Sequence, residues 1–124
     1  MGRRDVCILL VEDEDLIREI MSESLRDAGF DVVGASSGHE AMHLFDERPQ
    51  HFTMLVTDFN MPGQMDGGAL AERIREKAPA IPVVIVSGRP DVFRQSWRTE
   101  LNFALLQKPY RPHELVELAR TLMN

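Results

Sequence analysis

The 124-residue sequence is poor in cysteine and aromatic residues, and it has no long apolar run. Its single cysteine, Cys7, cannot form an internal disulfide, which favours a reducing, cytoplasmic location. Without an apolar stretch of about 20 residues, a membrane role is not expected. Acidic residues outnumber basic ones, 20 to 14, and the net charge of −6 argues against nucleic-acid binding by this domain.

Short apolar runs alternate with segments of helical periodicity five times along the chain. This alternation predicts one α/β domain over residues 1–124, with a five-stranded parallel sheet covered by helices on both faces. The predicted strands cover residues 6–11, 30–35, 52–57, 82–86 and 103–107. Helices are predicted over 16–28, after Ser37, after Asp66, over 91–100 and from Pro112 onward.

Several helix boundaries carry recognisable signals. Gly29 is suited to end the first helix, because glycine adopts the left-handed conformation that commonly follows a helix. Ser37 and Glu40 form a capping-box pattern, in which each side chain is expected to accept a backbone N–H of the other residue. Asp66 is a candidate N-cap, and Pro112 suits a first helical turn.

Polar side chains cluster where the predicted strands end. Glu12 and Asp13 follow the first strand, Asp58 follows the third, Ser87 the fourth and Lys108 the fifth. Ligands of open α/β sheets bind beyond the carboxyl ends of the strands. We therefore expect three acids, a hydroxyl and an ammonium group to meet at one rim of the sheet.

The chemistry of this set points to phosphoryl transfer. Three crowded carboxylates, on Glu12, Asp13 and Asp58, would repel one another, and a hard divalent cation such as Mg²⁺ relieves that repulsion. A carboxylate can act as the nucleophile that forms an aspartyl phosphate, which gives Asp58 its expected role. Lys108 and Ser87 would then hold the transferred phosphoryl oxygens.

Four segments that carry these residues resemble the receiver domains of two-component response regulators, the CheY-like family. The resemblance extends over nearly the whole chain, and the motifs occur in the right order and spacing. It implies a flavodoxin-like (βα)5 fold with strand order 2-1-3-4-5. The four segments are 9–14 (LLVEDE), 56–63 (VTDFNMPG), 84–88 (VIVSG) and 106–110 (LQKPY).

By this resemblance, Asp58 is the phosphoacceptor. Mg²⁺, with Mn²⁺ as an alternative, would be bound by Glu12, Asp13, Asp58 and the backbone carbonyl of Asn60. The bond between Lys108 and its following proline would be cis, as is common in the family. The domain would assist its own phosphorylation and dephosphorylation without being a turnover enzyme.

The resemblance also implies partners and a switch. The donor would be a histidine kinase or a histidine phosphotransfer protein, and the fourth helix, fifth strand and fifth helix would form the output face. Ser87 would move with the phosphoryl group. Leu105 stands where many receivers have Tyr or Phe, so it cannot signal by burying a ring and a hydroxyl. Phe93, Trp97 and Tyr110 lie in or near the output face, either as packing residues or as partner contacts.

Two further residues lie near the expected phosphoryl site, and the first is a second departure from many receivers. Gln64 is an extra residue in the loop after the phosphoacceptor, where it would alter the entrance beside Asp58. Arg89 lies two residues after Ser87, near the expected phosphoryl group. We hypothesise that Arg89 tunes the lifetime of the phosphoryl group; the alternative is a solvated loop arginine.

Other functions fit the sequence less well. His39 and His43 match the H-E-x-x-H pattern of zinc proteases, but they are expected to face solvent without a third ligand. An aspartyl-phosphate hydrolase commonly has a second acid where this chain has Asn60. A flavodoxin-like nucleotide binder would need a Gly-rich loop in place of Glu12 and Asp13. A receiver-like binding module that takes no phosphate remains as an alternative function.

Overall fold

The computed structural model describes residues 6–89, 91 and 103–123. Its centre is a five-stranded parallel sheet in the order β2-β1-β3-β4-β5. This order and the parallel pairing confirm the predicted doubly wound α/β fold. The strands are β1 (Cys7–Val11), β2 (Asp31–Ala35), β3 (Met54–Asp58), β4 (Val83–Ser87) and β5 (Ala104–Gln107).

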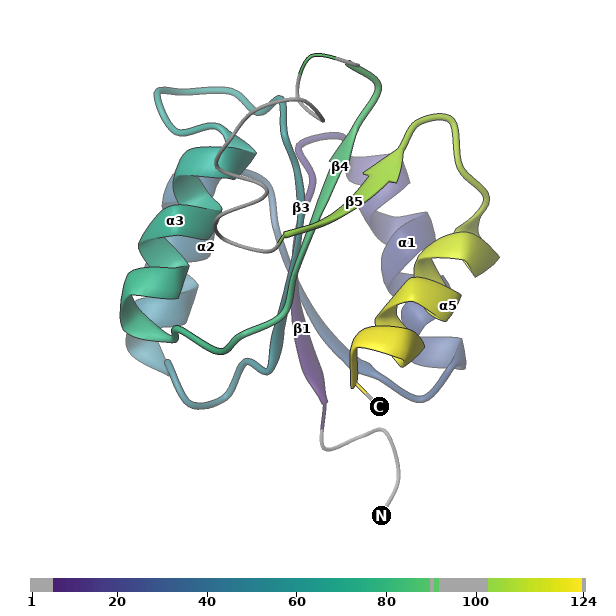
Figure 1. Cartoon of the computed structure of the whole chain (residues 1–124), viewed down its shortest axis with the longest axis horizontal. Coiled ribbons are helices and arrows are strands. Elements are labelled where there is room, and N and C mark those ends of the chain that lie inside the picture. Colours follow the sequence, from purple (N-terminus) through teal and green to yellow (C-terminus); the bar gives the residue numbers. More distant parts are fainter. Residues whose placement is uncertain (1–5, 90, 92–102, 124) are drawn as a thin grey trace.

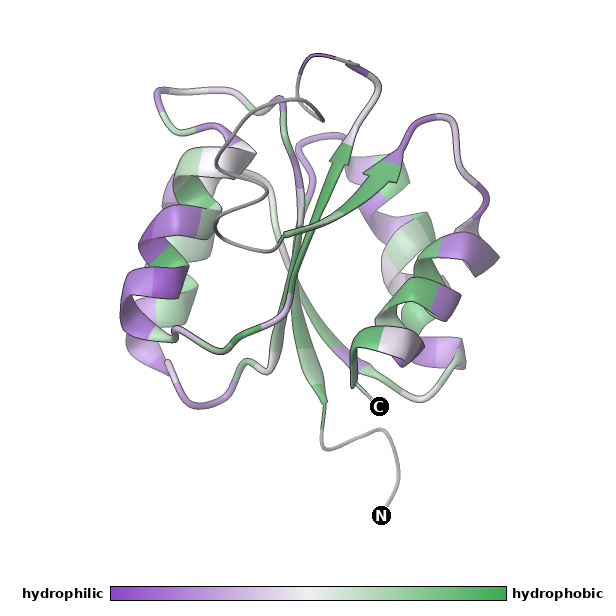
Figure 2. Cartoon of the chain, in the orientation of Figure 1, coloured by the Kyte–Doolittle hydropathy of each residue, from purple (hydrophilic) through white to green (hydrophobic). Residues whose placement is uncertain are grey.

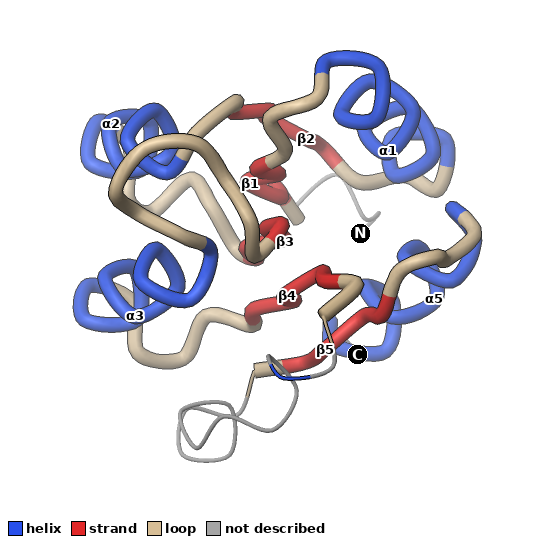
Figure 3. The backbone as a smooth tube through the Cα atoms, turned by 90° about the horizontal axis from the view of Figure 1, so that it is seen from above, coloured by secondary structure: helices blue, strands red, loops and turns tan. Residues whose placement is uncertain are grey.

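Helices cover the sheet on both faces, as Figures 1 and 3 show. One face carries α1 and α5, and the opposite face carries α2 and α3. The predicted helix over 91–100 lies outside the described residues, apart from Asp91, as do Phe93 and Trp97. The helix bounds are α1 (Asp15–Asp27), α2 (Gly38–Glu47), α3 (Gly67–Lys77) and α5 (Pro112–Met123).

The central strands are apolar because both of their faces are buried. Every residue of β1, β3 and β4 is buried. Successive side chains of a strand point to opposite faces, so Leu9 packs toward α2 and α3 while Ile8 and Leu10 pack toward α1 and α5. Figure 2 shows the apolar colour concentrated on the strands and on the helix faces turned toward them. The alternation therefore produces two hydrophobic layers around one sheet.

The helix ends follow the local signals with one exception. Gly29 has φ 99°, and its N–H donates to Arg26 while the N–H of Phe30 donates to Leu25, which closes α1 in a Schellman motif. The Ser37 hydroxyl accepts the N–H of Glu40 at 3.1 Å, as predicted. The second half of the capping box is wrong, because the Glu40 carboxylate accepts the N–H of the residue before Ser37 instead.

Two strands extend one residue further than their apolar runs indicated. Strand β3 ends at Asp58, and β4 ends at Ser87. Both polar residues were predicted to follow their strands, and both instead occupy the last strand position, where the ladder holds their backbones. The backbone N–H of the next residue, Phe59, still donates to the carbonyl of Val86 at 2.8 Å.

Within the described ranges, no helix has the length and hydrophobicity of a membrane span.

Candidate functional site

The predicted site residues meet at the carboxyl ends of the strands, at the top of the molecule in Figure 1. The parallel register explains this meeting, because it brings the ends of β1, β3, β4 and β5 to the same edge. Val11 pairs with Thr57 directly before the acids, Asp58 pairs with Val86, and Ser87 pairs with Gln107 directly before Lys108. Segments far apart in the sequence are therefore neighbours at this rim.

The three acids form a compact cluster. Glu12, Asp13 and Asp58 each offer a carboxylate oxygen, and these oxygens lie within 4.8 Å of one another. Two of the acids are buried, with 2% of Glu12 and 6% of Asp58 exposed, whereas Asp13 is exposed. The backbone N–H of Glu14 holds Glu12 by donating to its Oε2 at 3.0 Å. Two carboxylates are thus kept out of water beside a third.

Burial raises the pKa of both enclosed acids. For Glu12 the loss of hydration is the largest cause; the hydrogen bond from Glu14 opposes it and the neighbouring Asp58 adds to it. For Asp58 burial is again the largest cause, opposed by Lys108 and reinforced by the charges of Asp13 and Glu14. A bound cation would remove this electrostatic cost, so the donor set fits a hard divalent metal ion.

Lys108 supplies the positive charge of the site. Its Nζ lies 2.7 Å from Asp58 Oδ1, and its backbone N–H donates to the carbonyl of Ser87 at 2.9 Å. Burial lowers the pKa of Lys108, but the hydrogen bond and charge of Asp58, together with Glu12, outweigh it and raise that pKa overall. The bond between Lys108 and Pro109 is cis, as predicted. The ammonium is therefore charged at neutral pH and directed at Asp58.

Ser87 is buried at the end of β4, and its hydroxyl oxygen accepts the backbone N–H of Arg89 at 3.0 Å. This contact orders the start of the following loop.

Leu105 is partly buried on β5, packed against the hydrophobic layer that includes α2 and α3. A leucine at this position offers no hydroxyl to the site, as the sequence indicated.

The Arg89 side chain lies over the loop after Asp58. Its guanidinium forms two hydrogen bonds with Asp91, at 2.6 and 3.2 Å, and a third with Asn60 Oδ1 at 3.3 Å. The Phe59 ring centroid lies 5.8 Å from the guanidinium carbon. Arg89 is therefore exposed but contacts protein groups, and its effect on the lifetime of the phosphoryl group stays a prediction. The backbone carbonyl of Asn60 also stays a predicted ligand.

Gly67 is a site-supporting residue that the sequence reasoning missed. As the first residue of α3, it donates its N–H to the Phe59 carbonyl at 2.8 Å. A Cβ at this position would collide with the carbonyl oxygen of Asp58 and would lie 2.8 Å from the Cα of Phe59. Glycine is therefore needed for α3 to pack against the backbone of the candidate phosphoacceptor. The only signal in the sequence was its place directly after the Asp66 cap.

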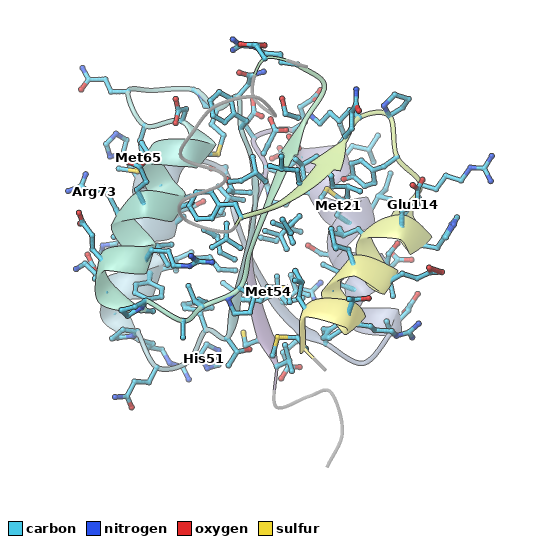
Figure 4. The ribbon with its side chains drawn as sticks, in the orientation of Figure 1. Met21, His51, Met54, Met65, Arg73 and Glu114 are labelled. Carbon is cyan, nitrogen blue, oxygen red and sulfur yellow. The ribbon has the colours of Figure 1, made fainter. Side chains whose placement is uncertain are left out.

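The longer loop after Asp58 packs against α2. Met65 is buried, and a Cβ built at Gly38 would lie 3.1 Å from its side chain. Figure 4 shows Met65 at the end of α3 that lies nearest the site rim. The extra residue, Gln64, is exposed, and its predicted effect on access to Asp58 stays a prediction.

An apolar groove adjoins the site on the α1 side. It encloses ≈ 530 Å³, and its wall includes Ile17, Ile20, Lys108 and Tyr110. Burial raises the pKa of Tyr110, and the charges of Glu12 and Asp58 raise it further. Tyr110 was expected in or near the output face, as a packing residue or a partner contact. In the fold it packs into the hydrophobic layer of α1 and α5.

The alternative zinc site is not supported by the geometry. His39 and His43 are both exposed on α2, as predicted. The described part of the chain contains one group of three or more potential metal ligands within reach of one another, and it is the acid cluster at the rim.

Comparison with known proteins gives a consistent result. The response regulator receiver domain family matches residues 8–120. The sensor kinase CckA of Brucella abortus is 32% identical over 118 residues, which are 94% of this chain and 12% of that protein. A probable transcriptional regulator ycf27 of Porphyridium aerugineum is 30% identical over 94% of this chain and 48% of its own length.

The fold is also found among solved structures. A response regulator receiver protein from Sinorhizobium medicae has a TM-score of 0.85 and 30% identity, with 96% of this chain and 94% of that chain covered. The chain spans less than half the length of the two curated relatives.

Proposed function

Because the chain belongs to the response regulator receiver domain family, we propose that it accepts a phosphoryl group on Asp58 in a two-component phosphorelay. The observation that carries this proposal is the environment of the Asp58 carboxylate. It is buried at the end of β3, within 4.8 Å of two other carboxylates, and paired with Lys108 at 2.7 Å. A structural turn residue would need neither the acid cluster nor the ammonium group.

Mg²⁺, or Mn²⁺ in its place, is the proposed cofactor. The residues that would hold it are Glu12, Asp13 and Asp58, with the backbone carbonyl of Asn60 as a further ligand. All of these are oxygen donors, which hard divalent cations prefer. When bound, the cation supplies charge neutralisation for the acid cluster and for an incoming phosphoryl group.

The chain's own groups account for the transfer step. An Asp58 oxygen attacks phosphorus, the bond from phosphorus to the donor histidine nitrogen breaks, and its electron pair remains on the imidazole. Lys108, already beside Asp58, binds the phosphoryl oxygens as they arrive, and the Ser87 hydroxyl is the second proposed contact. Most of the acceleration would come from positioning and charge stabilisation. The domain is then a phosphoacceptor that assists its own reaction, not a turnover enzyme.

The groove beside Lys108 supports a protein donor. Ile20, which lines the groove, is 47% exposed, and Leu16 on the same helix is 69% exposed; among the described residues they are the exposed large apolar side chains. We propose that a helix of a histidine kinase or phosphotransfer protein in the cytoplasm covers this surface. An Ile20→Asp variant should then slow transfer from such a protein more than transfer from acetyl phosphate. Equal slowing from both donors would contradict this docking surface.

The proposed output follows the family pattern. Phosphorylation adds charge and acceptor oxygens beside Ser87 and Lys108, which biases the neighbouring loop. Leu105 on β5 has no hydroxyl, so it would respond to phosphorylation only through a change in how its side chain packs. The fourth helix, β5 and α5 are the proposed surface for a downstream target.

Phosphorylation can be tested directly by intact mass measurement after incubation with Mg²⁺ and acetyl phosphate. The wild type should gain one phosphoryl group, and Asp58→Asn should gain none. Asp27→Asn is a matched control, because Asp27 is an exposed acid at the other end of α1. If folded wild-type protein gained no mass under these conditions, the alternative of an unphosphorylated binding module would replace this proposal.

A further inference from the structure

The Arg89–Asp91 ion pair is placed where it can affect the candidate phosphoacceptor. The Arg89 backbone N–H is fixed to the Ser87 hydroxyl oxygen at 3.0 Å. Its guanidinium extends over the Phe59 ring and reaches Asn60, the two residues after Asp58. One side chain therefore connects the loops that follow β3 and β4.

Asp91 is the strongest of the groups that hold the guanidinium. Its two oxygens accept hydrogen bonds at 2.6 and 3.2 Å, whereas Asn60 accepts one at 3.3 Å and is neutral. Paired, charge-assisted hydrogen bonds to a carboxylate are stronger and more directional than a single bond to an amide. Asp91 therefore determines the orientation of Arg89.

The pair is also easy to break. The side chains of Arg89 and Asp91 are 51% and 57% exposed, and exposed ion pairs contribute little net free energy. A phosphoryl group on Asp58 would be one residue from Phe59 and two from Asn60, both of which the guanidinium already contacts. Besides Asp91, which it hydrogen-bonds, and the charge of Asp66, the guanidinium would then have an anionic partner that exists only after phosphorylation.

We propose that Asp91 is a positioning residue that holds the Arg89 guanidinium away from the phosphoryl group on Asp58 and thereby shortens the life of the phosphorylated state. The inference rests on the proposed function. In the hydrolysis step, a water oxygen attacks phosphorus, and the bond from phosphorus to the Asp58 oxygen breaks with its electron pair left on the carboxylate. The water loses a proton to solvent, and inorganic phosphate leaves. A guanidinium released from Asp91 would bind the phosphoryl oxygens and obstruct this water.

The test is a double-mutant cycle on the decay of the phosphorylated protein. Wild type, Asp91→Asn, Arg89→Ala and the double variant are loaded with acetyl phosphate and Mg²⁺, freed of donor, and followed by intact mass measurement. Asp91→Asn should extend the half-life about two- to fivefold, the range expected if an exposed ion pair no longer competes for Arg89. The extension should vanish in the Arg89→Ala background.

Two additional variants distinguish positioning from a general charge effect. Asp91→Glu keeps the carboxylate and should return the half-life toward that of the wild type. Glu76→Gln removes one exposed acid elsewhere on the surface and should leave the half-life unchanged. The Arg89 side-chain NMR resonances provide a readout that does not depend on decay. On binding the phosphoryl mimic beryllofluoride, they should shift further in Asp91→Asn than in the wild type.

The outcomes separate this inference from the function on which it depends. If every variant took up a phosphoryl group but all decayed at the same rate, the positioning role would be refuted while Asp58 remained the phosphoacceptor. The same conclusion would follow if Asp91→Asn altered decay equally with and without Arg89. If no variant, including the wild type, gained a phosphoryl group, the proposed function itself would fail, and the role of Asp91 with it.

Discussion

Replacement of Gly67 by alanine should damage both the stability of the domain and its phosphorylation. The added Cβ would collide with the Asp58 carbonyl oxygen, and it would lie 2.8 Å from the Phe59 Cα and 3.0 Å from the Asp58 carbonyl carbon. All three are backbone atoms at the end of a central strand, so no side-chain rotation can relieve the contacts. Either α3 must move outward or the end of β3 must bend.

The size of the effect follows from opposing contributions. Overpacking in a dense interior costs about 1–3 kcal/mol, and losing the 2.8 Å hydrogen bond from the Gly67 N–H to Phe59 costs about 1 kcal/mol more. Alanine is the better helix former by at most about 1 kcal/mol. The unfolding free energy should therefore fall by about 2 kcal/mol, which for a domain of this length lowers Tm by about 8 °C.

Thermal and urea unfolding of Gly67→Ala would measure this change. Gly88→Ala is the matched control, because a Cβ at Gly88 has Lys108 Cβ at 3.6 Å as its nearest neighbour, an ordinary contact on the same rim. The rate of phosphorylation by acetyl phosphate should fall in Gly67→Ala, since the Asp58 backbone is displaced. An unchanged Tm and rate for Gly67→Ala would refute the close-approach reasoning.

Three other predictions concern separate parts of the fold. In the folded domain without a divalent cation, the pKa of Asp58 is raised above the ordinary Asp value of 3.8, so the folded state holds this proton more tightly than the unfolded state. The free energy of unfolding should therefore fall as the pH rises from 3.8 through the raised pKa. Urea titrations at several pH values would measure the free energy of unfolding of wild type and Asp58→Asn. If the difference between the two proteins did not change with pH, this prediction would be wrong. Burial, followed by the charge of Asp31, raises the pKa of the Cys7 thiol, so thiol reagents should react slowly with native protein and rapidly in denaturant; immediate native reaction would oppose this. Asp66→Ala should lose about 1 kcal/mol, because Asp66 Oδ1 accepts the Ala69 N–H at 2.8 Å to cap α3; unfolding curves that overlay the wild type would count against it.

Much of the fold could be predicted because its determinants are local. A helix start depends on groups within about four residues, so Ser37 and Asp66 were identified correctly from their neighbours. Gly29 was identified in the same way. A buried parallel strand is an apolar run, and five such runs between helical segments leave few topologies. The exact ends of β3 and β4 were missed, because a polar last residue interrupts the apolar pattern while the neighbouring strand still holds its backbone.

The candidate site was predicted as a set of residues but not as a set of contacts. The positions of Glu12, Asp58 and Lys108 at strand ends indicated that they would meet, because parallel strands end at one edge. The contact between Arg89 and Asn60 could not be predicted in this way. Asp91 is a local partner of Arg89, two residues further along the chain, whereas Asn60 belongs to the loop after β3 and meets Arg89 only in the fold.

The sequence by itself determined which segments would be buried, where most helices begin, and which polar groups would share the rim. These properties depend on apolar periodicity and on hydrogen bonds between near neighbours. Only the tertiary structure decided that Lys108 pairs with Asp58, that α3 approaches too closely for a side chain at Gly67, and that the Arg89 guanidinium reaches Asn60. These contacts depend on distances between separate elements, which the close packing of the whole sheet and its helices sets.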